Sequence, residues 1–219
     1  MPAPPEHAVA ESHIIARVHA SVLDVDPQAW NALLAQQAHA TPFMRHEYLA
    51  ALETSGSATP RTGWTPRFLT LWDAGALAAA CPLYLKTHSY GEYVFDWAWA
   101  SAYEQHGVPY YPKALVAVPF TPVPGSRLLA RDATARAQLV QAARQWCMEE
   151  DISSLHLLFA AEEDIATCAD QGLMLRHTVQ FHWQNMAPVA PVVSSEATSE
   201  CLAMPNRFTS FDDFLASLA

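Results

Sequence analysis

The residues best suited to chemistry lie close together in the middle of the chain. Residues 88–107 read HSYGEYVFDWAWASAYEQHG, in which carboxylates and histidines alternate with large aromatic rings. A strand buried on both faces would instead be rich in Val, Ile and Leu. Titratable and hydrogen-bonding groups among flat rings are typical of a pocket lining. This segment is therefore the candidate site.

Glu92, Asp96 and His88 are the candidate catalytic residues. Acyl transfer to an amine needs a base that takes the ammonium proton before or during attack, and a positioned carboxylate can supply it. Glu92 is the first choice, and His88 or His106 could shuttle the same proton. Each has a structural alternative, because a carboxylate among rings can be an acceptor for Tyr or Trp donors and a lone histidine can be a packing residue.

Aromatic side chains of the same region, with one lysine, are the candidate substrate-binding residues. They are Tyr90, Tyr93, Trp97, Tyr103, Tyr110, Tyr111 and Lys113. The rings could stack on a sugar or an acyl chain. Two tryptophans at i and i+2, as at Trp97 and Trp99, are more often part of a core, so that alternative stays open.

A group of arginines surrounds the start of a helix predicted over 132–149. Arg127, Arg131 and Arg136 stand out in an acidic chain. A helix N-terminus disfavours cations and favours anions, so arginines make sense there if a phosphate binds beside them. We expect these three to bind an anionic donor, with solvated surface arginine as the alternative.

Composition excludes several classes of function. The 219 residues hold 12 basic and 22 acidic side chains, a formal net charge of −10, so we expect no general nucleic-acid binding. The four cysteines lack a paired spacing, and no set of His, Cys and Asp has a metal-ligand spacing, so we expect reduced thiols and no metal site. Neither a membrane span nor a targeting signal is evident, which favours a cytoplasmic protein.

Periodicity and turn residues predict a mixed α/β fold, with helices on both faces of one twisted sheet. Asp26-Pro27 and Asp132 are the expected helix starts, and Pro82 should disturb its strand. The expected strands are 14–22, 68–72, 76–85, 114–118, 127–130, 153–159 and 173–183. The expected helices are 26–38, 42–55, 132–149 and 162–170.

Several strings in this order resemble one bacterial family closely. They are HSYGEYVFDWAWASAYEQHG at 88–107, YYPK at 110–113, PFTPVPGSRLL at 119–129, SSLHLLF at 153–159 and QFHWQN at 180–185. The family is that of predicted N-acyltransferases described as peptidoglycan biosynthesis or recognition proteins. It is similar to the Fem-type aminoacyltransferases and belongs to the wider GNAT superfamily.

The resemblance implies a GNAT-like fold of β-α-α-β-β-β-α-β-α-β order and transfer from acyl-CoA or aminoacyl-tRNA, with no tightly bound cofactor. The acceptor would be a small molecule or a cell-wall precursor. One departure concerns the donor, because the loop Arg/Gln-x-x-Gly-x-Gly/Ala that holds the pyrophosphate of acyl-CoA in GNAT enzymes is absent, and GSRLLARDATAR stands there instead.

The resemblance also sets the expected domain organisation. We expect a flexible N-terminus over 1–12, a GNAT-like domain over 13–185, a linker over 186–206, and over 207–219 the start of a helix that belongs to a missing C-terminal half of the family's fold. The predicted function is an N-acyltransferase acting on an amine, truncated here. The alternative is a non-catalytic half that recognises a cell-wall precursor or glycan.

Overall fold

The computed structural model describes residues 14–94, 96–182, 185 and 208–216, in two compact units, Met1–Leu175 and Arg176–Ala219. The predicted flexible N-terminus and the whole of the predicted linker lie outside these residues. The strands of the first unit are β1 (Ile15–His19), β2 (Trp64–Pro66), β3 (Phe68–Asp73), β4 (Ala76–Cys81), β5 (Leu83–Lys86), β6 (Lys113–Val116), β7 (Leu129–Ala130) and β8 (Leu155–Leu157). Its helices are α1 (Pro27–Leu34), α2 (His46–Thr54), α3 (Trp97–Gln105), α4 (Ala133–Glu149) and α5 (Glu162–Asp170).

The strands form two four-stranded sheets rather than one, in the orders β1-β3-β4-β7 and β2-β5-β6-β8. Pro82 separates β4 from β5, because proline has no N–H to continue a ladder, and the chain passes there from the first sheet to the second. Most neighbouring strands are antiparallel, and β6 and β8 form a parallel pair. The mixed α/β class predicted from the sequence is confirmed.

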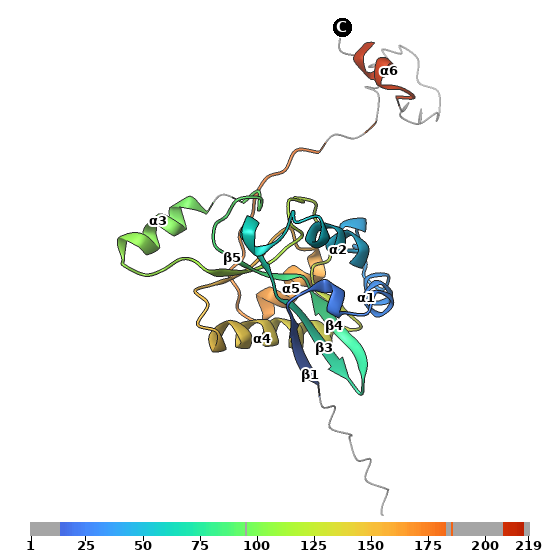
Figure 1. Ribbon diagram of the computed structural model, residues 1–219. Coiled ribbons are helices and arrows are strands. Elements are labelled where there is room, and N and C mark those ends of the chain that lie inside the picture. Colours follow the sequence, from blue (N-terminus) through green and yellow to red (C-terminus); the bar gives the residue numbers. More distant parts are fainter. Residues whose placement is uncertain (1–13, 95, 183–184, 186–207, 217–219) are drawn as a thin grey trace, which may run out of the picture. The chain divides into compact units, whose positions relative to one another are not determined.

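Helices enclose two hydrophobic cores because β3 and β4 alternate their side chains between two faces (Figure 1). Phe68 and Ala80 pack with Trp30 of α1 and Leu49 of α2, in one core. The residues between them along the strands face the other core, which α4 and α5 complete. That core includes Leu69, Leu71, Ala79, Cys81, Leu139, Val140, Ala143, Cys147 and Cys168.

The helix starts follow their expected capping residues. The Asp26 carboxylate accepts hydrogen bonds from the N–H groups of Gln28 and Ala29, at 3.2 and 3.1 Å, and Pro27 occupies the first helical position. Asp132 accepts from the N–H of Ala135 at 2.7 Å and caps α4. Such caps satisfy N–H groups that the first helical turn leaves unpaired.

The strand predicted over 173–183 is wrong for residues 173–182, none of which lies in a strand, and Trp183 lies outside the described residues. The alternation of Leu173, Leu175, Val179 and Phe181 suggested one buried face. Of these four, Leu173 packs against a core, whereas Leu175 is 42%, Val179 82% and Phe181 98% exposed, so the alternating side chains share no buried face. Alternation alone does not form a strand without a neighbour.

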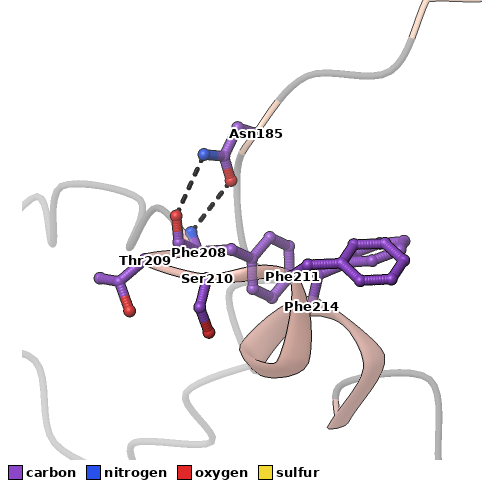
Figure 2. Close-up of a pocket in the computed structure, with 6 residues that line it drawn as sticks. All are labelled: Asn185, Phe208, Thr209, Ser210, Phe211 and Phe214. Carbon is purple, nitrogen blue, oxygen red and sulfur yellow. Dashed lines mark hydrogen bonds between the residues drawn. The ribbon is translucent and has the colours of Figure 1, made fainter.

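The described part of the second unit contains α6 (Phe211–Ala216), which begins at the expected Ser210 cap. The Asn185 side-chain amide pairs with the Phe208 backbone, donating to its carbonyl at 3.1 Å and accepting from its N–H at 3.0 Å (Figure 2). These residues and the rings of Phe211 and Phe214 line a hollow of about 550 Å³. Within the described residues, no helix combines the length and apolar character needed to cross a membrane.

Candidate functional site

Strand pairing places two lysines side by side in the protein interior. β5 and β6 are antiparallel, with Lys86 directly opposite Lys113, and both side chains are buried. Like charges at such a cross-strand position repel each other. The pair therefore requires negative charge nearby, and Glu92 and Asp96 supply it.

The connection from β5 to α3 turns Glu92 inward. Glu92 lies between two left-handed residues, Gly91 at φ 80° and Tyr93 at φ 57°. Gly91 is needed there for a second reason, because a Cβ at this position would collide with the ring of Phe120. The positive φ of Tyr93 is energetically unfavourable for a residue other than glycine. Such strained residues are often found in functional segments. The result is a buried Glu92 between exposed tyrosines.

Lys113 is the centre of the resulting charge cluster. Its Nζ lies 2.7 Å from Glu92 Oε2 and 2.5 Å from Asp96 Oδ2, and all three side chains are at most 3% exposed. One further oxygen on each carboxylate, Glu92 Oε1 and Asp96 Oδ1, is buried and has no hydrogen-bond partner within the described part of the chain. Buried carboxylate oxygens normally have donors, so this cluster has unused acceptor capacity.

Hydroxyl groups extend the cluster toward the surface. Tyr110 donates to Asp96 Oδ2 at 2.7 Å, and the Ser89 hydroxyl lies 2.9 Å from the same oxygen. Lys113 donates to Ser89 Oγ at 2.8 Å, and the Tyr111 hydroxyl lies 2.8 Å from Ser89 on its other side. Tyr111 is half-buried, so the network reaches from the interior to the edge of the site.

The two carboxyl groups have opposite pKa shifts. Burial raises the pKa of Glu92 above its ordinary value, although the Lys113 hydrogen bond opposes the rise. Burial also acts against ionisation of Asp96, but hydrogen bonds from Lys113, Tyr110 and Ser89 prevail and lower its pKa. Acid–base sites commonly contain two titratable groups whose environments shift their pKa values in opposite directions. Asp96 is thus the stronger acid of the two carboxyl groups.

Lys86 is held differently from Lys113. Its Nζ lies 3.6 Å from the centre of the Trp64 ring and donates to the carbonyl of Tyr90 at 3.2 Å. Burial lowers the pKa of Lys86 to about 8, with Lys113 adding to the effect and Glu92 opposing it. The ring and the carbonyl offset part of the cost of burying this ammonium.

The lowered pKa of Lys86 makes a pH-dependent contribution to stability. Between pH 8 and its ordinary value of 10.5, the unfolded chain binds more protons at this residue than the folded protein, so stability rises with pH across that window. Urea unfolding of the wild type and of Lys86→Met should show the wild type gaining stability relative to the variant from pH 8 to pH 10.5. A pH-independent difference would contradict this prediction.

Aromatic residues surround the cluster at the surface. Tyr90, Tyr93 and Trp97 are exposed, and the rings of Tyr90 and Trp97 meet edge to face at 5.9 Å. Tyr103 packs in the same way against Tyr110, at 5.1 Å. A hollow of about 460 Å³ opens here, with Tyr110, Tyr111 and Glu104 in its walls. Two tyrosines therefore line the hollow with their rings and reach the charge cluster with their hydroxyls.

His88 lies beside the cluster rather than in it. Its ring occupies the space over Gly63, where a Cβ would collide with it, and meets Tyr90 edge to face at 5.1 Å. Burial lowers its pKa, with Lys86 adding to the effect, so the ring is neutral at pH 7 and can accept a proton. Its role as a shuttle stays a prediction.

The three arginines do not form one cluster. Arg127 is buried and donates to the carbonyls of Val123 and Leu158, at 2.5 and 3.1 Å. Arg131 pairs with Asp73 at 2.6 Å and with Asp132 at 3.2 Å. Arg136 pairs with the buried Asp164 at 3.2 Å and donates to Gln37. Each guanidinium thus has partners within the protein, and an anion site at these arginines stays a prediction.

Sequence reasoning did not single out Ser89, and it did not place Lys86 among the site residues. One signal could have found Lys86, because Lys86 and Lys113 are the only lysines in the whole sequence and both fall in the aromatic region. Nothing comparable marks Ser89. Among the described residues no group of three or more His, Cys, Asp or Glu side chains is arranged to hold a metal ion.

The fold and site define a mixed α/β protein with a buried acid–lysine cluster beside an aromatic hollow. The chain belongs to the FemAB-like family, described as peptidoglycan biosynthesis/recognition, whose model matches residues 21–189. No curated protein matches the chain.

Solved structures similar to it include the following three, all at low identity. One is an aminoglycoside N-acetyltransferase AAC(6')-Iy in complex with CoA, at 12% identity and a TM-score of 0.46, with 81% of this chain and 99% of that one covered. A second structure of AAC(6')-Iy, with a bisubstrate analogue, has 13% identity, a TM-score of 0.44, and coverage of 79% and 99%. A ribosomal-protein-alanine N-acetyltransferase from Brucella melitensis biovar Abortus 2308 has 14% identity, a TM-score of 0.44, and coverage of 78% and 98%.

Proposed function

We propose that this chain is an N-acyltransferase of peptidoglycan metabolism that transfers an acyl or aminoacyl group to the amine of a cell-wall precursor. The observation that carries the proposal is the buried Glu92, whose Oε2 binds Lys113 while Oε1 has no hydrogen-bond partner among the described residues. A carboxylate with a raised pKa and a free oxygen is suited to accept a proton from an ammonium group.

In the proposed reaction Glu92 takes one proton from the acceptor's ammonium group. The neutral amine then attacks the carbonyl carbon of a thioester or ester donor, so that a C–N bond forms and the bond to the leaving thiolate or alkoxide breaks. As the bond to the leaving group breaks, the nitrogen loses a second proton and the leaving group takes it up. Glu92 then releases the proton it took to solvent, and no covalent intermediate with the protein forms. Lys113 and Lys86 keep the site neutral in total while Glu92 and Asp96 are both ionised.

In this proposal the aromatic residues bind the acceptor. Tyr110 and Tyr111 line the hollow and connect it to Asp96 and Ser89 by their hydroxyls, so an acceptor bound there would lie next to the cluster. Tyr90, Tyr93 and Trp97 are exposed, and their rings could stack on the acceptor. The hollow is of the size that small-molecule sites have, which are typically ~300–1,000 Å³.

The proposal is tested with purified protein, an amine-bearing peptidoglycan precursor, and acyl-CoA or aminoacyl-tRNA as alternative donors. Mass spectrometry should detect a precursor whose mass has increased by the acyl or aminoacyl group. The matched control is the same mixture with an acceptor whose amine is already acetylated, which should give no product. Saturable binding of the precursor without transfer from either donor would contradict the proposal.

That last result would favour a second function, recognition of a cell-wall precursor without chemistry. One observation supports it. The stretch GSRLLARDATAR replaces the expected CoA-binding loop, and two of its arginines are paired with carboxylates, Arg131 with Asp73 and Asp132 and Arg136 with Asp164. A recognition protein would not need the proton-accepting state of Glu92, so binding should survive Glu92→Gln.

A further inference from the structure

The hollow of about 460 Å³ beside α3 has one charged side chain among its described walls, Glu104. Glu104 and Ala100 of α3 form one side of the hollow, and the loop 107–111 forms the other. The Glu104 carboxylate has no hydrogen bond or ion pair with another described residue, and it is exposed. A carboxylate in the wall of a hollow, with no cation of its own, attracts a positively charged ligand.

The remaining walls are apolar or aromatic. They include Val108, Pro109, Tyr110 and Tyr111, and the two tyrosine rings meet edge to face at 4.9 Å. The tyrosine hydroxyls are engaged with Asp96 and Ser89, so the rings are what these residues offer to a ligand. Aromatic rings pack against alkyl chains and attract cations at their faces. An alkyl chain that ends in an ammonium group matches both kinds of wall.

The charge around the hollow favours a cation over an anion. In the buried cluster behind the tyrosines, Lys86 and Lys113 balance the charges of Glu92 and Asp96. Glu104 then leaves the surroundings of the hollow with a negative charge, in a chain whose formal net charge is −10. A neutral or anionic ligand gains nothing from this carboxylate.

A cation held by Glu104 is a different group from the amine that reacts. Asp96 stands immediately before α3, and Glu104 follows it by eight positions, about 12 Å along the helix axis. Glu92 binds the same lysine nitrogen as Asp96, so it lies at the Asp96 end. An ammonium group paired with Glu104 therefore does not reach Glu92 while it stays bound.

We propose that this hollow binds an alkylammonium group, with Glu104 as its counter-charge, and that the acceptor carries this positive group in addition to its reacting amine. The assignment of the ligand to the acceptor rests on the proposed function. The binding of the cation does not, and it can be measured without any acyl donor.

The test is titration of the full-length protein with pentylammonium chloride, followed by calorimetry. Pentanol and pentanoate serve as the neutral and the anionic ligand of the same chain length. We expect the ammonium to bind, the alcohol to bind about tenfold more weakly and the carboxylate not to bind. Glu104→Gln should weaken binding of the ammonium by about tenfold and leave that of the alcohol unchanged.

Two further variants complete the test. Glu150→Gln removes another exposed carboxylate, at the end of α4, and should bind as the wild type does. Ala100→Leu keeps a good helix former but fills the hollow, so it should weaken binding of the ammonium and the alcohol alike. Equal affinity for ammonium and alcohol, or unchanged binding in Glu104→Gln or Ala100→Leu, would overturn the proposal. Because Glu104 is exposed, its variant should unfold at the same urea concentration as the wild type.

Transfer measurements separate this inference from the proposed function. An acceptor without the second positive group should have a higher KM and an unchanged kcat, and Glu104→Gln should abolish the difference. Transfer with the same KM for both acceptors would overturn the inference and leave the proposed function standing. Binding of pentylammonium at Glu104 without transfer from any donor would confirm the cation site and count against the proposed function.

Discussion

Replacing Lys113 with methionine should lower the free energy of unfolding by about 3–5 kcal/mol, because removing one partner of a buried ion pair leaves an uncompensated charge in the interior. Here two carboxylates lose the same partner, since Glu92 and Asp96 both bind the Lys113 ammonium. Methionine has a similar volume, so the loss reports charge rather than a cavity. Urea unfolding at pH 7 followed by circular dichroism measures it.

A triple variant provides the control for this prediction. Lys113→Met combined with Glu92→Gln and Asp96→Asn removes the two negative charges along with the positive one, and replacement of a whole buried ionic group is often close to neutral. It should recover most of the stability lost in the single variant. If Lys113→Met alone stays within about 1 kcal/mol of the wild type, the carboxylates are solvated and the cluster is not a closed buried network.

The sequence indicated which segment holds clustered polar groups, and it did not indicate their geometry. Glu92 and Asp96 were identified because carboxylates among aromatic rings are uncommon in a core, and the structure places both within reach of Lys113. The strand expected from residue 114 begins instead at Lys113, which pairs with Lys86. Cross-strand register depends on two distant segments, and no local pattern in either segment defines it.

The partners of the arginines also could not be predicted from the local sequence. The start of α4 was predicted correctly from Asp132, and the helix dipole made a phosphate a reasonable partner for the arginines around it. The local pattern could not show that Asp73 on β3 and Asp164 on α5 would lie beside Arg131 and Arg136. Those contacts join residues far apart in the chain.

Helix α3 was not predicted because its residues and their neighbours differ in secondary-structure propensity. Alanines favour a helix, whereas tryptophan and tyrosine favour strands and the neighbouring glycines favour turns. The helical signal is strongest when an apolar stripe faces a core, and α3 has no such stripe because none of its residues is buried. The sequence of α3 alone therefore did not indicate a helix.

Glu92→Gln should reduce the rate of acyl transfer by ~10²–10⁴-fold while leaving the protein folded. Glutamine keeps the size of the side chain and can still accept a hydrogen bond from Lys113, but it cannot take a proton from the acceptor's ammonium group. Single-turnover measurements with saturating acceptor isolate the chemical step. The decrease should appear in the rate constant rather than in the affinity for the acceptor, because the proton transfer occurs only during reaction.

The pH dependence separates a base from a structural residue. If Glu92 is the base, the wild-type rate should rise with pH through a pKa above the ordinary range of a glutamate, because burial raises the pKa of this carboxyl, and the variant should lack that step. Asp96→Asn is the comparison, since Asp96 binds the same lysine but has a lowered pKa; because its charge helps to raise the pKa of Glu92, this variant should keep the step and move it to lower pH. Wild-type turnover in Glu92→Gln, or an unaltered pH profile, would assign proton removal to another group, of which His88 is the nearest candidate already neutral at pH 7.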